Sequence, residues 1–361
     1  MVTSDVPLQL IAALLVLLIP LGLLLIDRVS IRARAASASA AVVVGMVASW
    51  ALNAVLSSPS DLPARVLDAS FAGAIAGGVA ILAARFGPVG AAVFASLWSV
   101  LVFQPVFAAT VGSVPSLVQI VFGAVDFSAV LATHVAASAS MIAASLLPGP
   151  RRRVVSDLAA LSRPRGMVPA GLVAVGATAW MVGAERVLSV ATGRTLANSI
   201  VGLVLGALMW WLIERIAGRP FSPSGLTTGV VIAWGAIGLG VPFLAPTALG
   251  ATAVIATAAG VAIVVRAPSG AIVERRVSIG IIVAVAVGGT VLALLADGFG
   301  MAATGSTALV AAQLGAVIAV AVGAFGSGLL CAGAALIAIV IAERRSTTAA
   351  QQATKAGDAE E

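Results

Sequence analysis

An aspartate and the only histidine of the chain lie eight residues apart in a segment that is otherwise apolar or small. Asp126 and His134 belong to the stretch AVDFSAVLATHVAASASMIAASLLPGPRRR, which runs from residue 124 to residue 153. Ionisable side chains are expensive inside a membrane, so they usually face a cavity or a partner. On a helix, eight residues span about 12 Å along the axis and about 80° around it, so the two side chains share one side without touching.

The pair allows two interpretations. In the first, the two residues line a polar path, with Asp126 shaping its outer part and His134 its centre. In the second, Asp126 caps a helix and His134 bonds to a neighbouring carbonyl group. The other polar side chains that the sequence places at depth, several tryptophans aside, are Gln104, Gln119, Asn198 and Gln313.

The whole chain has the composition of a membrane protein. Hydrophobic residues make up 61% of it, charged residues make up 9%, and the mean hydropathy is +1.15. Apolar runs of about twenty residues recur, and each is long enough to cross a hydrocarbon core of roughly 30 Å as a helix. The runs are continuous, whereas membrane β-strands alternate apolar and polar residues. We therefore predict an all-α, multi-pass protein of the plasma (cytoplasmic) membrane.

Hydropathy predicts eleven transmembrane helices. The last is long enough, at roughly 55 Å, that it must tilt, kink or project from the bilayer. A basic loop over 148–167 separates five spans from five more, which is the arithmetic of two inverted five-helix repeats plus a long last helix. We predict a transmembrane domain over 1–345 and a disordered cytoplasmic tail over 346–361. The spans are 8–26, 36–56, 66–84, 87–111, 124–147, 168–188, 196–213, 225–243, 247–265, 277–296 and 306–342.

The basic residues support this count. With the N-terminus outside, seventeen of the twenty lie on the cytoplasmic side, as the positive-inside rule requires. The three predicted outside are Arg65, Arg186 and Arg194. The first ten residues carry no basic region, which favours a first span that starts outside rather than a cleaved signal peptide. The net charge of +6 therefore reports topology and does not indicate a nucleic-acid partner.

Several kinds of chemistry are excluded or poorly supported. One histidine and one cysteine cannot build a usual zinc site, and no cofactor is expected. The only lysine, Lys355, lies in the tail, so no phosphate-binding loop is present and ATP hydrolysis by this chain is excluded. A single histidine beside an intramembrane aspartate gives thin grounds for a hydrolase triad. We do not expect an enzyme.

The segment from Val125 to Arg153 resembles the fifth-span signature of the ammonium transporter (Amt/Mep/Rhesus) family. That signature has Asp-Phe-Ala-Gly-Gly, then Val-His, then small residues before a basic loop, with the same Asp-to-His spacing. The stretch ASFAGAIAGGVAILAARFGPVGAAVFASLWSVLVFQPV resembles the third and fourth spans, with Trp98 seven residues before Pro105. LANSIVGLVLGALMWWLIERIAGRPFSPSGLTTGVVIA resembles the seventh and eighth spans.

The resemblance implies a homotrimer with one narrow apolar pore per subunit. In such a pore an outer aromatic site recruits ammonium, two stacked phenylalanines form a gate, and two histidines share a proton. Phe71 matches the first gate phenylalanine, Asp126 the aspartate that supports recruitment, and His134 the first pore histidine. Family members commonly bind a PII-type signal protein, but the short tail here carries no motif that supports this partner.

The chain departs from the family at several positions. The second pore histidine is absent, and Ile282 takes its place in the alignment. The outer-site tryptophan falls near Val111, and the segment WMVGAERVLSV that begins at Trp180 offers neither the second gate phenylalanine nor the site serine. The first-span pattern has become IPLGLLLIDR.

Three functions remain open at this point. The first is a divergent ammonium or ammonia channel-type transporter with a single pore histidine, with Phe71, Asp126 and His134 on the path. The second is a non-conducting paralogue that acts as a partner or sensor. The third is an unrelated secondary transporter in which Asp126 and His134 couple transport to protons.

Overall fold

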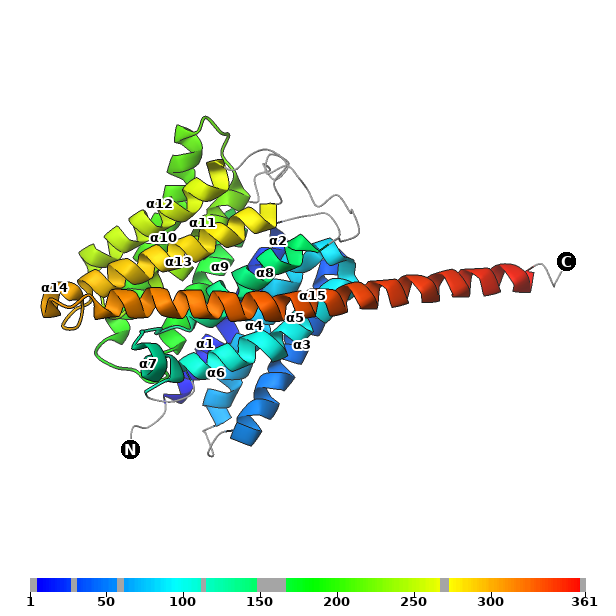
Figure 1. Cartoon of the computed structure of the whole chain (residues 1–361), viewed down its shortest axis with the longest axis horizontal. Coiled ribbons are helices and arrows are strands. Elements are labelled where there is room, and N and C mark those ends of the chain that lie inside the picture. Colours follow the sequence, from blue (N-terminus) through cyan, green and yellow to red (C-terminus); the bar gives the residue numbers. More distant parts are fainter. Residues whose placement is uncertain are drawn as a thin grey trace.

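The structure, a computed structural model, describes residues 5–26, 31–56, 62–111, 115–147, 167–266 and 273–357. Helices make up all of the regular secondary structure in these ranges, and they pack into one bundle (Figure 1). In the first half the elements are α1 (Val6–Leu15), α2 (Leu18–Leu25), α3 (Ile31–Leu56), α4 (Leu62–Leu82), η1 (Ala83–Phe86), α5 (Gly87–Trp98), η2 (Ser99–Phe103), α6 (Gln104–Val111), α7 (Leu117–Phe122), η3 (Leu131–Ala136) and α8 (Ala137–Leu146). In the second half they are α9 (Met167–Gly183), α10 (Thr192–Ile216), α11 (Pro223–Ile237), α12 (Pro246–Arg266), α13 (Val273–Leu295), α14 (Met301–Thr304) and α15 (Ala308–Gly357).

Several of these helices are long and apolar enough to span a membrane. Among the described residues, seven candidates satisfy length and composition, and one of them covers α4 to α6 as a single run of 50 residues. Three shorter apolar helices lie at Leu131–Leu146, Met167–Gly183 and Pro223–Ile237. The prediction of an all-helical, multi-pass membrane protein is confirmed at this level, whereas the count of eleven spans stays a prediction.

Prolines account for two local departures from regular α-helix. Pro20 has no N–H to donate to the carbonyl of Val16, so Ile19 donates to that oxygen instead, at 3.1 Å, at the break between α1 and α2. The π-helical turn η2 leads directly into α6, where Pro105 likewise lacks an N–H. Gly87, with φ of 70°, separates η1 from the rest of α5 and lets the chain reverse between α4 and α5.

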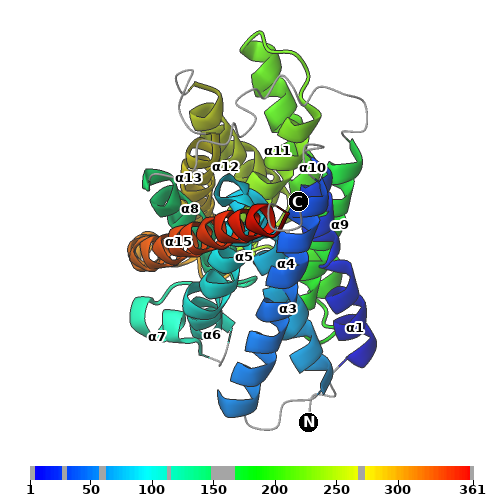
Figure 2. The same ribbon diagram turned by 90° about the vertical axis from the view of Figure 1, so that its right-hand side faces the viewer.

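The last helix lies along the outside of the bundle and continues far beyond it (Figures 1 and 2). Within the bundle, α15 packs against α5 and α8. Its 50 residues correspond to about 75 Å, more than twice a hydrocarbon core of roughly 30 Å. Of the three outcomes predicted for the last span, which were to tilt, to kink or to project, the structure shows projection beyond the bundle. Helix α15 continues past the predicted domain boundary at 345 to Gly357, and the disorder expected for the tail over 346–361 stays a prediction.

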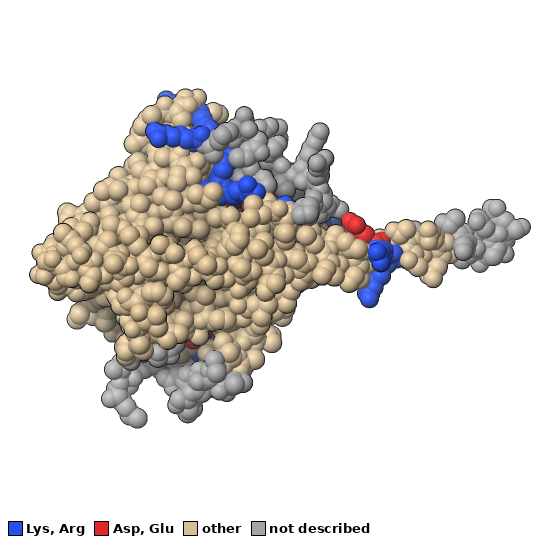
Figure 3. Space-filling model, viewed as in Figure 1, with Lys and Arg blue, Asp and Glu red and all other residues tan. Residues whose placement is uncertain are grey.

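Basic residues gather at one end of the bundle. Figure 3 shows Lys and Arg side chains over the end away from the N-terminus, and also on the projecting part of α15. At this end Arg85 donates to the carbonyl of Leu147 at 3.1 Å, and Arg275 donates to the Ser145 hydroxyl at 2.8 Å. Most of the predicted cytoplasmic loop, residues 148–166, lies outside the described residues. So do the basic residues Arg28, Arg151, Arg152, Arg153, Arg163 and Arg165.

Two irregular segments meet inside the bundle, one before η3 and one after α11. Phe127 N–H donates to the carbonyl of Leu239 at 3.0 Å, and Ser128 N–H donates to that of Gly238 at 3.2 Å. Non-helical backbone at membrane depth needs such partners, because lipid offers none. The Asn198 amide supplies two more, donating to the carbonyl groups of Val241 and Leu244 at 2.8 and 3.1 Å.

Three of the four amide side chains that the sequence singled out bond to backbone groups, whereas the amide nitrogen of the buried Gln104 has no partner among the described residues. Like Asn198, Gln313 satisfies irregular backbone, because its amide donates to the carbonyl of Val125 at 2.9 Å. Gln119 belongs to a capping box at the start of α7, with its side chain bonded to Ser116 N–H at 2.9 Å. These contacts hold the chain around Asp126 and His134 in place.

Candidate functional site

His134 lies in the π-helical turn η3, where the backbone is locally wider than an α-helix. Its side chain is buried, with 4% of its surface exposed. The Nδ1 atom is 2.8 Å from the hydroxyl of Thr133, and that hydroxyl donates to the carbonyl of Ala129 at 3.0 Å. The ring also interacts with the backbone of Val231. Because π-turns are frequent at functional sites, this local geometry favours a role beyond packing.

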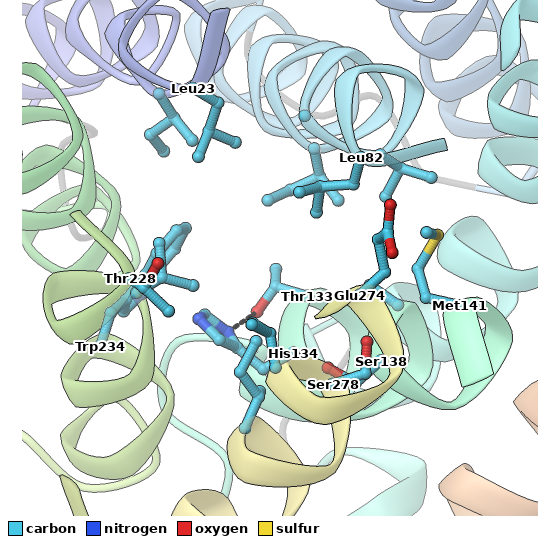
Figure 4. Close-up of a pocket in the computed structure, with 18 of the residues that line it drawn as sticks. Leu23, Leu82, Thr133, His134, Ser138, Met141, Thr228, Trp234, Glu274 and Ser278 are labelled. Atoms are coloured by element: carbon cyan, nitrogen blue, oxygen red, sulfur yellow. Dashed lines mark hydrogen bonds between the residues drawn. The ribbon is translucent and has the colours of Figure 1, made fainter. Parts of the chain in front are cut away.

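A cavity of about 260 Å³ lies beside His134. Figure 4 shows His134 and Thr133 on one side of the open space, Trp234 and Thr228 on another, and Leu23 and Leu82 facing them. The walls are mostly apolar, but hydroxyl groups from three helices also reach it. These come from Ser138, Ser224, Thr228 and Ser278. His134 thus borders a cavity and does not point into lipid.

The cavity extends from His134 toward the basic end of the bundle. Its lining on α4 includes Ala74, Gly78 and Leu82, which follow Phe71 along that helix. Glu274, at the start of α13, also lines it and is electrostatically close to Arg85. A carboxylate therefore lies at the end of the cavity that is nearest the basic end of the bundle.

The isoleucine that the sequence alignment placed at the second pore histidine does not line the cavity beside His134. Helix α13 lines the cavity with Val277, Ser278 and Ile281, whereas Ile282 is half-buried and does not line it. Helical spacing explains the difference, since residues three and four apart share a face. No second titratable group faces the imidazole from this stretch, because Ile281 ends in a hydrocarbon side chain.

Trp234 packs directly against the imidazole. The two ring centroids are 4.6 Å apart and the planes meet at 85°, an edge-to-face arrangement. Gly235 permits this approach, because a Cβ atom there would lie 2.9 Å from Cδ2 of His134. The site therefore combines one imidazole with an indole wall.

An aromatic stack closes the other end of this region. Phe71 and Trp180 lie face to face with centroids 3.9 Å apart and an interplanar angle of 18°. Phe107 meets the edge of Phe71 at 6.3 Å, and Trp180 meets Trp234 at 5.6 Å. Both stacked rings are buried and neither lines the cavity. On α4, Phe71 precedes all of the lining residues, so the stack lies between the cavity and the start of that helix.

Trp180 is held in this position by its ring nitrogen. The Nε1–H group donates to the carbonyl of Ser128 at 2.8 Å, in the irregular segment before η3. The sequence placed a gate phenylalanine after Trp180 and found no candidate, but in the structure the tryptophan itself is the ring stacked on Phe71. The signal was present as an aromatic residue within the predicted span over 168–188.

Asp126 lies at the start of the fifth predicted span, away from the cavity. Its two carboxylate oxygens accept from the backbone N–H groups of Val130 and Leu131, at 2.7 and 2.9 Å. It does not line the cavity and does not contact His134. This geometry matches the interpretation of Asp126 as a helix cap, which orients the turn that carries His134.

Sequence comparison identifies no relative, because the chain matches no protein-family model and no curated protein. Structural comparison finds solved structures with a similar fold. Mep2 from Candida albicans superposes with a TM-score of 0.73 at 18% identity, covering 91% of this chain and 83% of that one. Mep2 from Saccharomyces cerevisiae gives 0.70 at 15% identity, covering 91% and 86%. A protein described as a sensor Amt protein gives 0.68 at 14% identity, covering 94% and 93%.

The chain has the Amt/Mep fold. It is the fold implied by the resemblance of the segment that carries Asp126 and His134. At these identities the likeness concerns the fold alone, so the site must be argued from its own residues. Within the Amt/Mep fold, this chain combines one buried histidine, a hydrocarbon side chain on α13 and a Phe71–Trp180 stack.

Proposed function

We propose that this protein is a divergent member of the ammonium transporter family that conducts ammonium or ammonia through each subunit. The observation that carries the proposal is the cavity of about 260 Å³ beside His134, behind the Phe71–Trp180 stack, in a chain with the Amt/Mep fold. The path would run past the stack and His134 to the basic end of the bundle.

The chemistry of the walls suits a neutral solute. An unpaired cation in an apolar environment costs many kcal/mol, whereas a small neutral amine needs only one or two hydrogen-bond partners. His134 and Thr133 supply such partners, and Ile281 supplies none. A single imidazole cannot pass a proton to a second one, so we infer that this path favours ammonia over the intact ion.

The residue roles follow from this proposal. Phe71 and Trp180 form the gate, His134 forms the polar centre, and Asp126 positions the turn of His134 without touching the solute. The same proposal includes eleven spans, obtained by dividing the run over α4 to α6 into two and adding the three shorter helices, with the first and second five related as inverted repeats. It also includes an outside N-terminus, a cytoplasmic C-terminus and a homotrimer.

A second candidate function is favoured by the aromatic stack. Rings 3.9 Å apart and fully buried leave no room for a solute, so a chain that never opens the stack would be a non-conducting paralogue, a partner or a sensor. The third function, an unrelated proton-coupled transporter, is not proposed, because the fold is Amt/Mep and Asp126 makes no contact with His134.

Flux into proteoliposomes tests the proposal. Purified protein is reconstituted with a trapped pH-sensitive dye, and an inward ammonium gradient is applied; ammonia that crosses takes up a proton and raises the internal pH. We expect a faster rise than in protein-free vesicles. Ile281→Trp should abolish the gain by filling the cavity, whereas Ile282→Trp, one residue away and outside the cavity, should retain it.

Two outcomes would contradict the proposal. A rise equal to that of empty vesicles, with correctly folded protein in the bilayer, would favour the non-conducting paralogue. Equal rates for Ile281→Trp and wild type would show that the cavity beside His134 is not part of the conduction path. Size-exclusion profiles of both variants show whether the larger side chains leave the fold intact.

A further inference from the structure

Arg186 has a backbone conformation that is unusual for its side chain. Helix α9 ends at Gly183, and the N–H of Arg186 donates to the carbonyl of Gly183 at 3.0 Å in the turn that follows. Its φ is 62°, in the left-handed region that favours glycine. Holding a non-glycine residue there costs about 1 kcal/mol or more and persists only where the surroundings enforce it.

Three elements enforce the position of Arg186. Its Nη2 atom donates to Oδ1 of Asp68 on α4, at 2.6 Å, in an ion pair whose side chains are 31% and 13% exposed. The buried Gln9 amide on α1 donates to the carbonyl of Arg186 at 2.7 Å. Asp68 also bonds to the side chain of Asn53 on α3. The guanidinium is thus tied to the bundle and does not extend freely into solvent.

This ion pair lies one helical turn beyond the aromatic stack. Asp68 precedes Phe71 by three residues on α4, so both side chains lie on the same face. Arg186 follows Trp180 after the last turn of α9, and a Cβ atom at Gly183 would lie 3.4 Å from the tip of the Phe71 ring. The cavity lining on α4 starts only after Phe71, so the pair and the cavity lie on opposite sides of the stack.

We propose that Arg186 is a tethered cation that controls access of free cations to the stack from this end of the bundle. The Arg186 guanidinium occupies the position beside Asp68 that a free cation would take, so this carboxylate does not attract ammonium to the Phe71–Trp180 gate. Attraction between a carboxylate and a cation is strong in a partly buried site, where the effective dielectric constant is well below that of water, so an unpaired Asp68 would draw ammonium to the gate. This inference rests on the proposed function, because it assigns Arg186 the control of charge selectivity at the mouth of the same path.

Substitution of Arg186 tests this directly. Arg186→Gly removes the cation and suits the backbone, and Arg186→Asn gives a second variant whose side chain tolerates this conformation. Arg186→Lys keeps the charge. The matched control is Arg194→Ala, which removes an arginine on the same side of the chain whose partner, Asp297, is 2.7 Å away and exposed. We expect Arg186→Gly and Arg186→Asn to raise the initial ammonium-driven flux by about tenfold, equivalent to about 1.4 kcal/mol. Arg186→Lys and Arg194→Ala should match wild type.

A binding measurement separates failure of this inference from failure of the proposed function. Methylammonium is added to each purified variant, and the shift in its melting temperature is recorded. We expect a shift for Arg186→Gly and Arg186→Asn that is absent in wild type and Arg186→Lys. If neither wild type nor any variant conducts but this shift is seen, the proposed role of Arg186 is supported and the proposed conduction is overturned.

The remaining outcomes would contradict the proposed role of Arg186. Conduction by wild type with no gain in either uncharged variant would overturn the tethered cation and leave the proposed function intact. An equal gain in Arg186→Lys would show that charge is not the cause. Absence of both flux and a methylammonium-dependent shift in all variants would overturn both proposals.

Discussion

Asp126 caps the turn that carries His134 and does not line the cavity beside it. Its carboxylate accepts from two buried N–H groups at the start of η3, the turn that carries His134. In a membrane protein such donors have no water to replace the carboxylate. We therefore expect substitution of Asp126 to lower the stability of the fold.

We predict that Asp126→Ala destabilises the fold by at least about 2 kcal/mol, because each buried donor left unsatisfied costs about 1–3 kcal/mol. Asp126→Asn keeps one acceptor and should cost less. The melting temperature of the protein in detergent, followed by fluorescence-detected size exclusion, measures both changes. Asp5→Ala is the control, since Asp5 precedes α1 without a side-chain cap bond. Equal melting temperatures for Asp126→Ala and wild type would show that the cap is dispensable.

Helices pack closely in this bundle because glycines meet at their crossings. At the crossing of α12 and α13, a Cβ atom on Gly260 would lie 2.5 Å from the carbonyl oxygen of Gly280, and the reverse distance is 2.7 Å. Because the clash would be with a backbone oxygen, no change of side-chain rotamer can relieve it. Small residues at such contacts are a general feature of membrane helix packing.

Gly280→Ala should therefore force α12 and α13 apart and cost about 1–3 kcal/mol, the usual range for overpacking. Gly333→Ala on α15 is the matched control, because nothing lies within 4 Å of its Cβ position. There alanine should be neutral or stabilising, since it is the better helix former by about 1 kcal/mol. Melting temperatures of the two variants check this, and similar values for both would contradict the close crossing.

The whole molecule has two chemically different ends. One carries Arg85 and Arg275 near the start of α13, and the projecting part of α15 also carries basic residues. The other carries the N-terminal end of α1 and the loop between α9 and α10. The positive-inside rule predicts that the first end faces the cytoplasm.

Labelling of single cysteines tests this orientation. With the buried Cys331 replaced by alanine, Val190→Cys and Ser346→Cys each place one thiol at an exposed position, on the α9–α10 loop and on the projecting part of α15. We expect a membrane-impermeant maleimide to label Val190→Cys in intact cells and Ser346→Cys only after permeabilisation. The reverse pattern would invert the topology, and labelling of both in intact cells would refute an odd number of spans.

The sequence alone determined the class of the protein and the region of the site. Continuous apolar runs can satisfy their backbone in lipid only as helices, so an all-helical membrane fold follows from composition and run length. An aspartate and a lone histidine in such a run pointed to the segment that the structure places beside a cavity.

Only the tertiary structure decided which side chains meet. The stack of Phe71 on Trp180, the contact of Trp234 with His134, and the ion pair of Arg186 with Asp68 all join residues far apart along the chain. Helical phase likewise placed Ile281, and not Ile282, at the cavity. Local pattern fixes the period of a helix but not its rotation against its neighbours. That rotation is set by close packing of glycines and aromatic rings across the bundle.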